Sequence, residues 1–191
     1  MIGQIAHLND TVFVPTQMLP WSAGTSPVWF LMPHTLDLML WLSGKTVQRV
    51  HAQGVRGLLS AQGIDTWDSV DASIEFTDGT NATLHSSWVL PVSYPAMYDF
   101  RYELVGSRAA LRIESAEQGI QLMGDKLSWP QWDVREASGR IQGFPVDMAY
   151  DFVEHLLGRA EDVPTVTDGM KVTAILAAVD RSLASGSPVD L

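Results

Sequence analysis

The order of elements along the chain predicts an α+β fold: one open, mainly antiparallel sheet with its helices gathered on one face. Three observations support it: an opening strand leads into an apolar helix, a run of alternating strands follows, and two helical segments close the chain. With 191 residues, 46% of them hydrophobic, the chain can bury a core. We therefore expect residues 1–191 to form a single α+β domain.

The first expected elements are a strand over residues 2–8 and a helix after a loop rich in Pro, Ser and Gly. Ser26 and Pro27 are typical of a helix start, and Gly44 is typical of a helix end. The helix either runs without interruption or is broken at Pro33 and resumed. Its apolar residues cover nearly the whole circumference, so we expect it to be buried.

A β-hairpin is expected around Asp78 and Gly79, because apolar and polar residues alternate on both sides of this pair. A two-residue loop would pair Phe76 with Asn81 and put the two apolar sets on opposite faces. A three-residue loop, with Gly79 in the left-handed conformation, would pair Phe76 with Thr80 and give one apolar face. We prefer the second register.

Further strands are expected over residues 46–55, 98–104 and 109–113. A helix beginning at Pro145 and ending at Gly158 carries an apolar stripe, and a last helix capped by Thr167 or Asp168 ends at Gly186. The second sheet face would carry polar residues and be either solvated or an interface. These residues are Asp71, Ser73, Glu75, His85, Asp99, Arg101 and Glu103.

Composition excludes several classes of protein. The net charge of -10 disfavours nucleic acids and anionic membrane surfaces, and the absence of cysteine excludes disulfides and thiolate sites. The most apolar stretch, residues 27–42, is shorter than a membrane span, and the start lacks a cationic leader. We therefore expect a cytoplasmic protein. No Gly-x-Gly-x-x-Gly or Gly-x-Ser-x-Gly sequence occurs, so we expect no dinucleotide to bind this chain alone.

His34 and Asp37 are the best candidates for catalysis. Residues three apart share a helix face, so Asp37 can orient His34 and stabilise its protonated form, as a general acid/base requires. A core histidine satisfied by a carboxylate or a backbone carbonyl is the structural alternative. A metal site formed with His85 or His7 has no specific ligand spacing, so we assign no metal.

Aromatic residues in and before the same helix are candidates for sugar binding, because aromatic faces stack on sugar rings. We name Trp29, Phe30 and Trp21 as substrate-binding candidates, although most of the aromatic residues could instead belong to the core. Trp21, Trp129 and Trp132 lie beside prolines and are expected to be partly exposed.

The sequence resembles the second domain of the Gfo/Idh/MocA family (glucose-fructose oxidoreductase, inositol dehydrogenase and rhizopine catabolism). The resemblance rests on residues 27–44 (PVWFLMPHTLDLMLWLSG), 71–80 (DASIEFTDGT), 102–111 (YELVGSRAAL) and 182–186 (SLASG), in the family's order. It implies an open sheet like that of the glyceraldehyde-3-phosphate dehydrogenase C-terminal domain.

The resemblance further implies the substrate-binding and oligomerisation domain of an NAD- or NADP-dependent oxidoreductase acting on a sugar, polyol or related compound. An N-terminal dinucleotide-binding (Rossmann) domain, absent from this chain, would be its partner, and the open sheet face would form homo-oligomers. His34 matches the histidine of the family's Asp-x-x-x-His pair, but Phe30 stands where the aspartate would be. A stand-alone, non-catalytic ligand-binding or assembly module is the alternative. In neither case is the isolated chain expected to be active.

Overall fold

A computed structural model describes residues 1–130, 134–160 and 163–191 and confirms the α+β class. Seven strands form one sheet in the order β11-β2-β3-β4-β1-β5-β6, in which only β1 and β4 pair in parallel among the described strands. The strands of this sheet are β1 (Gly3–Thr11), β2 (Val47–Val55), β3 (Ser69–Phe76), β4 (Asn81–Leu90), β5 (Tyr98–Val105), β6 (Ala110–Glu114) and β11 (Val189–Asp190).

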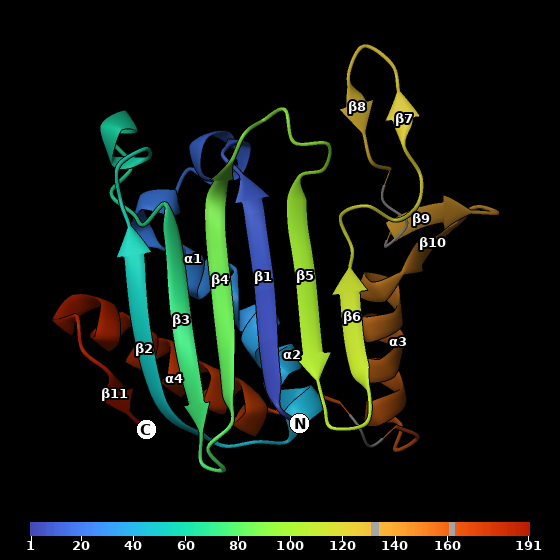
Figure 1. The fold of residues 1–191 in the computed structure, drawn as a ribbon. Coiled ribbons are helices and arrows are strands. Elements are labelled where there is room, and N and C mark those ends of the chain that lie inside the picture. Colours follow the sequence, from blue (N-terminus) through green and yellow to red (C-terminus); the bar gives the residue numbers. More distant parts are fainter. Residues whose placement is uncertain (131–133, 161–162) are drawn as a thin grey trace.

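Three helices cover one face of the sheet, as expected, and lie behind it in Figure 1. They are α1 (Pro27–Phe30), α2 (Met32–Ser43) and α4 (Val166–Ser185). Apolar side chains from this face and from the helices form the main core, which includes Ala6, Leu36, Met39, Ile74, Phe76, Leu84 and Leu176. The described residues leave the opposite face uncovered (Figure 1).

The hairpin of β3 and β4 has the preferred register. Ile74 pairs with Ala82, and the backbone N–H of Phe76 donates to the carbonyl of Thr80 over 2.9 Å. Gly79 has a φ of +80°, the left-handed conformation that a three-residue loop requires. The single apolar face inferred from the alternation is therefore confirmed.

The expected helix before Gly44 is divided into α1 and α2, and Gly44 ends it with a φ of +62°. The expectation that this helix is buried all round is wrong, because the side chain of Trp41 is 65% exposed and His34 is also exposed. Only one side of α2 faces the sheet, so apolar residues on its other side lie on the surface.

The last helix, α4, begins two or three residues earlier than expected, since the predicted cap was Thr167 or Asp168. Its N-cap is Thr165, whose side chain accepts from the N–H of Asp168, while the Asp168 carboxylate accepts from the N–H of Thr165. This reciprocal arrangement is a capping box, and it satisfies two backbone donors at the helix start. The predicted end at Gly186 is confirmed by its left-handed φ of +66°.

Helix α3 (Phe144–Leu156) does not join the other helices over the core, contrary to the expectation that all helices cover one face. It lies at the β6 end of the sheet, and none of its residues, all of them described, is buried. Two small hairpins that the sequence did not predict precede it (Figure 1). They are β7 (Leu122–Met123) with β8 (Leu127–Ser128), and β9 (Val134–Ala137) with β10 (Arg140–Gly143).

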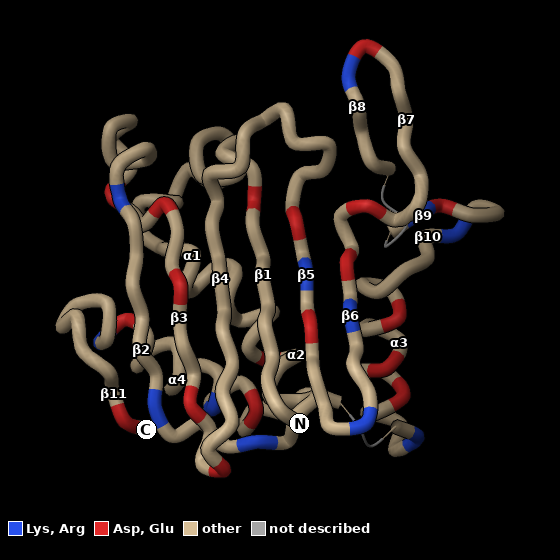
Figure 2. The backbone as a smooth tube through the Cα atoms, viewed as in Figure 1, with Lys and Arg blue, Asp and Glu red and all other residues tan. Residues whose placement is uncertain are grey.

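The uncovered face is polar, as expected, and Figure 2 shows charges of both signs alternating along β5. Glu103 and Arg112 face one another across β5 and β6 at 3.2 Å, and Arg49 lies 3.7 Å from Glu75 across β2 and β3. No described helix is long and apolar enough to cross a membrane.

Candidate functional site

A groove with a volume of about 900 Å³ is lined by residues of α2 and α4, together with residues 44–47, 163–164 and 191. Residues of α2 and α4 spaced three or four apart form its walls, because such residues share one face of a helix. The walls consist of His34, Asp37, Leu38 and Trp41 from α2 and Asp168, Lys171, Ala174 and Ile175 from α4. The groove therefore combines apolar surface with a histidine, two carboxyl groups and an amine.

His34 and Asp37, the two catalytic candidates, both line this groove. His34 is exposed and Asp37 is partly buried, and no hydrogen bond joins the two described side chains. Burial raises the pKa of Asp37, the negative charge of Asp168 raises it further, and the nearby His34 lowers it. Asp37 therefore takes up a proton more readily than an ordinary aspartate.

Asp168 behaves in the opposite way on the other wall. Hydrogen bonds from the side chain and backbone of Thr165 lower its pKa to about 2, and Lys171 contributes through an Nζ–Oδ1 distance of 3.2 Å. The groove thus contains one carboxyl group that protonates easily and one that stays ionised. Such a pair is suited to acid/base chemistry.

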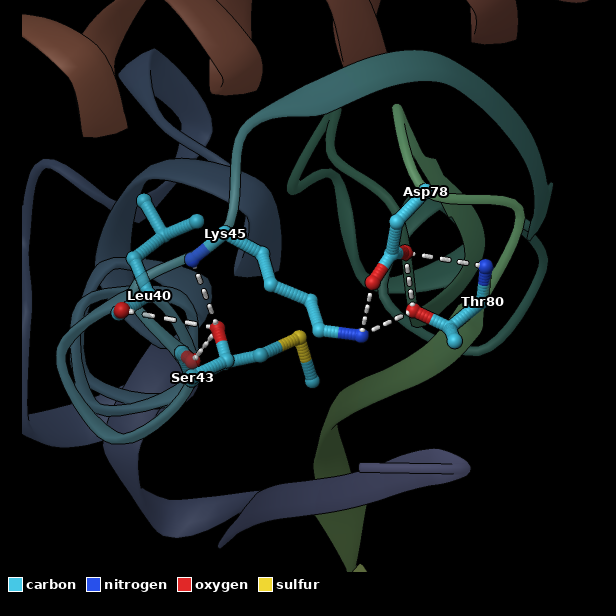
Figure 3. Close-up of polar contacts among 6 residues, drawn as sticks. Leu40, Ser43, Lys45, Asp78 and Thr80 are labelled. Atoms are coloured by element: carbon cyan, nitrogen blue, oxygen red, sulfur yellow. Dashed lines mark hydrogen bonds and ion pairs between the residues drawn. The ribbon is translucent and has the colours of Figure 1, made fainter.

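Lys45 lies at the end of the groove but is already engaged (Figure 3). Its Nζ lies 2.6 Å from Oδ2 of Asp78 and donates to the hydroxyl of Thr80. The contact with Lys45 lowers the pKa of Asp78, and so do the hydrogen bonds that the Thr80 hydroxyl and backbone N–H donate to this carboxylate. Ser43, at the end of α2, accepts from the backbone N–H of Lys45 over 3.3 Å. Lys45 therefore links α2 to the hairpin of β3 and β4, and we do not assign it to a ligand.

The aromatic candidates do not line the groove. Phe30 packs between Trp21 and Trp88, with ring centroids 6.0 Å and 6.1 Å away. Trp29 instead donates through Nε1 to a carboxylate oxygen of Asp180 over 2.5 Å, which ties α1 to α4. Trp21 is 54% exposed and is the most accessible of the three candidates. Trp129 is half-buried, and Trp132 lies outside the described residues.

Sequence reasoning missed three wall residues of the groove. Trp41 lies seven residues after His34, so a helical projection could have placed it on the same face. Asp168 was considered only as a cap, and no spacing in the sequence relates it or Lys171 to a helix more than 120 residues earlier.

The sequence lacks the glycine-rich motif that usually binds a dinucleotide. The usual pyrophosphate cradle is a glycine-rich turn between a strand and a helix, whereas β1, one of the two parallel strands, continues into Val12-Phe13-Val14-Pro15. Within the described ranges, no group of three or more His, Asp or Glu side chains could hold a metal ion.

Solved structures with the same fold include several dehydrogenases, although the curated protein sequences gave no significant match. Myo-inositol 2-dehydrogenase from Lactobacillus plantarum is 19% identical with a TM-score of 0.78, over 100% of this chain and 57% of that chain. Scyllo-inositol dehydrogenase from Lactobacillus casei, with bound NAD(H) and scyllo-inositol, is 18% identical with a TM-score of 0.73, over 98% and 56%.

GenD2 from gentamicin A biosynthesis, in complex with NAD, is 20% identical with a TM-score of 0.81, over 100% of this chain and 55% of that chain. The present chain thus spans little more than half the length of these structures, and identities at this level establish the fold alone. A family model for the GFO/IDH/MocA C-terminal domain matches residues 2–112, which include His34 and Asp37. Because this match covers more than half of the chain, the chain belongs to the Gfo/Idh/MocA family and corresponds to the family's C-terminal domain.

Proposed function

We propose that this chain is the substrate-binding and oligomerisation domain of an NAD(P)-dependent oxidoreductase that acts on a sugar, polyol or related hydroxy compound. The observation that carries the proposal is the groove between α2 and α4, in which His34 and Asp37 line one wall within the segment that matches the family. A histidine beside a carboxyl group is the arrangement that proton exchange with a substrate hydroxyl requires.

In this proposal His34 exchanges a proton with the hydroxyl that is oxidised, and Asp37, which lines the same groove, orients the imidazole. The nicotinamide would accept the hydride. Because the sequence lacks the glycine-rich dinucleotide motif, a separate N-terminal Rossmann domain would hold NAD(P), and two of the similar structures contain NAD or NAD(H).

Phe30 occupies the position at which the resemblance implies an aspartate, and its ring packs between Trp21 and Trp88. A packed aromatic ring cannot carry a proton, so His34 would act without this second group. The same observation favours the alternative function, a non-catalytic module that binds a sugar-like ligand or assembles through the sheet. Trp21 and Trp29 remain candidates for stacking on the substrate.

The uncovered sheet face is proposed as the surface for self-association. The seven strands together contain 51 residues. At about 3.3 Å per residue and about 4.8 Å between strands, they give a face on the order of 800 Å², close to the contribution of one partner to a standard interface. Its charges are largely paired internally: Asp71 with His85, Asp99 with Arg101 and Glu103 with Arg112. Paired charges lower the cost of covering this face with a second copy.

The test is a chimera in which the dinucleotide-binding domain of the Lactobacillus plantarum myo-inositol 2-dehydrogenase precedes this chain. We expect NADH formation with at least one inositol or sugar and a decrease in kcat of about a hundredfold for His34→Gln. His155→Gln, which changes an exposed histidine on α3, serves as the matched control.

An unchanged kcat in His34→Gln would remove His34 from the mechanism, and turnover by the isolated chain would refute the need for a second domain. If no chimera is active but calorimetry detects a sugar or polyol binding to the isolated chain, the non-catalytic module is the correct alternative.

A further inference from the structure

One row of charged and titratable side chains crosses the uncovered face from β3 to β6. The register aligns its members on neighbouring strands, and all of them point away from the helices. In order across the sheet they are Asp71, His85, His7, Arg101 and Glu114.

Both imidazoles of this row lie at the middle of the sheet. The ring centroids of His7 and His85 are 5.6 Å apart, on β1 and β4. The Nδ1 of His85 lies 2.8 Å from Oδ1 of Asp71, so a carboxylate is available to balance a charge on His85. Arg101 is balanced as well, by Asp99 at 3.0 Å and Glu114 at 3.7 Å.

His7 has no ion pair or side-chain hydrogen bond to a described residue. The groups that face it are His85 from β4, Arg101 and Asp99 from β5, and Asp71 from β3. Burial lowers its pKa most, His85 and Arg101 lower it further, and the two aspartates oppose these effects without reversing them. A proton on His7 is therefore disfavoured even before anything covers the face.

The positions of His7 and His85 in the sheet determine which side chains of a second copy would contact them. Because β4 is the central strand of seven and β1 is its neighbour, a two-fold contact centred on the face places these two imidazoles against the same two of the second copy. Resting on the proposed self-association, we infer that the uncovered face is a pH-sensitive contact between two copies of this chain, closed while His7 is neutral and opened when His7 is protonated.

The direction follows from proton linkage. Covering the face buries His7 further and adds two imidazoles to its surroundings, so the paired state binds protons more weakly than the separated chains. Because the pKa of His7 in the separated chain already lies below the ordinary histidine value of about 6.5, the contact keeps its full strength at pH 6.5 and above and weakens as the pH falls through that lowered pKa.

The experiment is sedimentation equilibrium of the full chain at pH 7.5 and pH 5.5, with circular dichroism to verify folding at both. We expect the dissociation constant of the wild type to increase by about tenfold at pH 5.5, because both copies of His7 must release on pairing the proton that the separated chains bind, and each pH unit below the pKa of the separated chain gives up to a factor of ten per histidine. His7→Gln should show less than about a threefold change, and the off-face control His155→Gln should behave like the wild type.

Thr83→Arg on β4 places a bulky cation on the same face and should abolish association at both pH values. If this variant still associates, the contact lies elsewhere and the inference is overturned. A wild type with the same dissociation constant at both pH values overturns the pH dependence alone. A monomer at both values overturns the proposed self-association and the inference with it.

Discussion

Helices α3 and α4 have similar apolar patterns but opposite environments. On α4 the stripe formed by Val172, Ile175, Leu176 and Val179 is buried against the sheet. On α3 a stripe with equivalent spacing, formed by Met148, Phe152 and Leu156, is exposed. Helical periodicity therefore identifies a face that could be buried, but whether it is buried depends on the surface next to the helix.

The elements next to each helix explain why the apolar stripe of α4 is buried and that of α3 is exposed. Helix α4 lies across β2 and beside α2, so its stripe faces apolar residues of both. Helix α3 follows β10 at the β6 end of the sheet and adjoins that small hairpin (Figure 1). The opposite side of α3 is acidic, with Asp147, Asp151 and Glu154 (Figure 2). The described residues thus give α3 little apolar surface to pack on.

The largest expected effect comes from the same substitution in the two helices. Leu176→Ala should lower the free energy of unfolding by about 2–5 kcal/mol, because Leu176 is 2% exposed and its truncation leaves a cavity in the core. Leu156→Ala should change it by less than about 0.5 kcal/mol, because Leu156 is 68% exposed. Urea unfolding followed by tryptophan fluorescence measures both.

A loss of more than about 2 kcal/mol for Leu156→Ala would show that α3 is buried in solution and would remove the contrast. Equal small losses for both variants would instead place α4 outside the cooperative core. The matched substitution cancels the intrinsic difference in helix propensity between Leu and Ala.

Sequence patterns predicted most of the layer that positions the site. The register at Phe76 and Thr80 and the helix ends at Gly44 and Gly186 followed from local rules, since turn length and left-handed glycines depend on neighbouring residues alone. The places of α3 and of the hairpins before it did not follow, because packing over a long distance decides them.

The candidate site was predictable on one side only. His34 and Asp37 share a helix face by spacing, whereas Asp168 on the opposite wall reaches the groove through the packing of α4 against α2. The separation of Phe30 from the groove also depends on tertiary packing, namely the aromatic contacts to Trp21 and Trp88.

An intermediate effect is expected at Asp10, near the end of β1, whose carboxyl group is buried. Burial raises the pKa of Asp10 to about 6, so the folded state binds this proton more tightly than the unfolded chain. The contribution of Asp10 to stability is therefore fully present below about pH 4, where the carboxyl group is neutral in both states, and is lost as the pH rises through about 6. Asp10→Asn should stabilise the protein by about 1–3 kcal/mol at pH 7.5.

This gain should shrink towards zero near pH 4, where the carboxyl group of the wild type is already neutral. The matched control is Asp147→Asn on the exposed face of α3, for which we expect no change at either pH. Urea unfolding at the two pH values provides the measurement, and a gain independent of pH would contradict the explanation by burial.

The smallest effect concerns how each helix begins. Helix α4 has the capping box of Thr165 and Asp168, whereas the N-cap of α3 is Gly143, which has no side chain to accept a hydrogen bond. Thr165→Ala should cost about 1 kcal/mol, because the N–H of Asp168 loses its side-chain acceptor. It should also raise the pKa of Asp168, since the hydroxyl that hydrogen-bonds the carboxylate is removed.

Amide hydrogen exchange distinguishes this local effect from a global one. In Thr165→Ala the first turn of α4 should exchange faster, approaching the rate of the first turn of α3, while amides around Leu176 keep their protection relative to global unfolding. Thr173→Ala is the matched control, because the Thr173 hydroxyl donates to the carbonyl of Gly169 within the same helix and satisfies no free backbone donor. If both substitutions speed exchange equally, the difference between the two helices lies in packing alone, and the capping box contributes nothing to it.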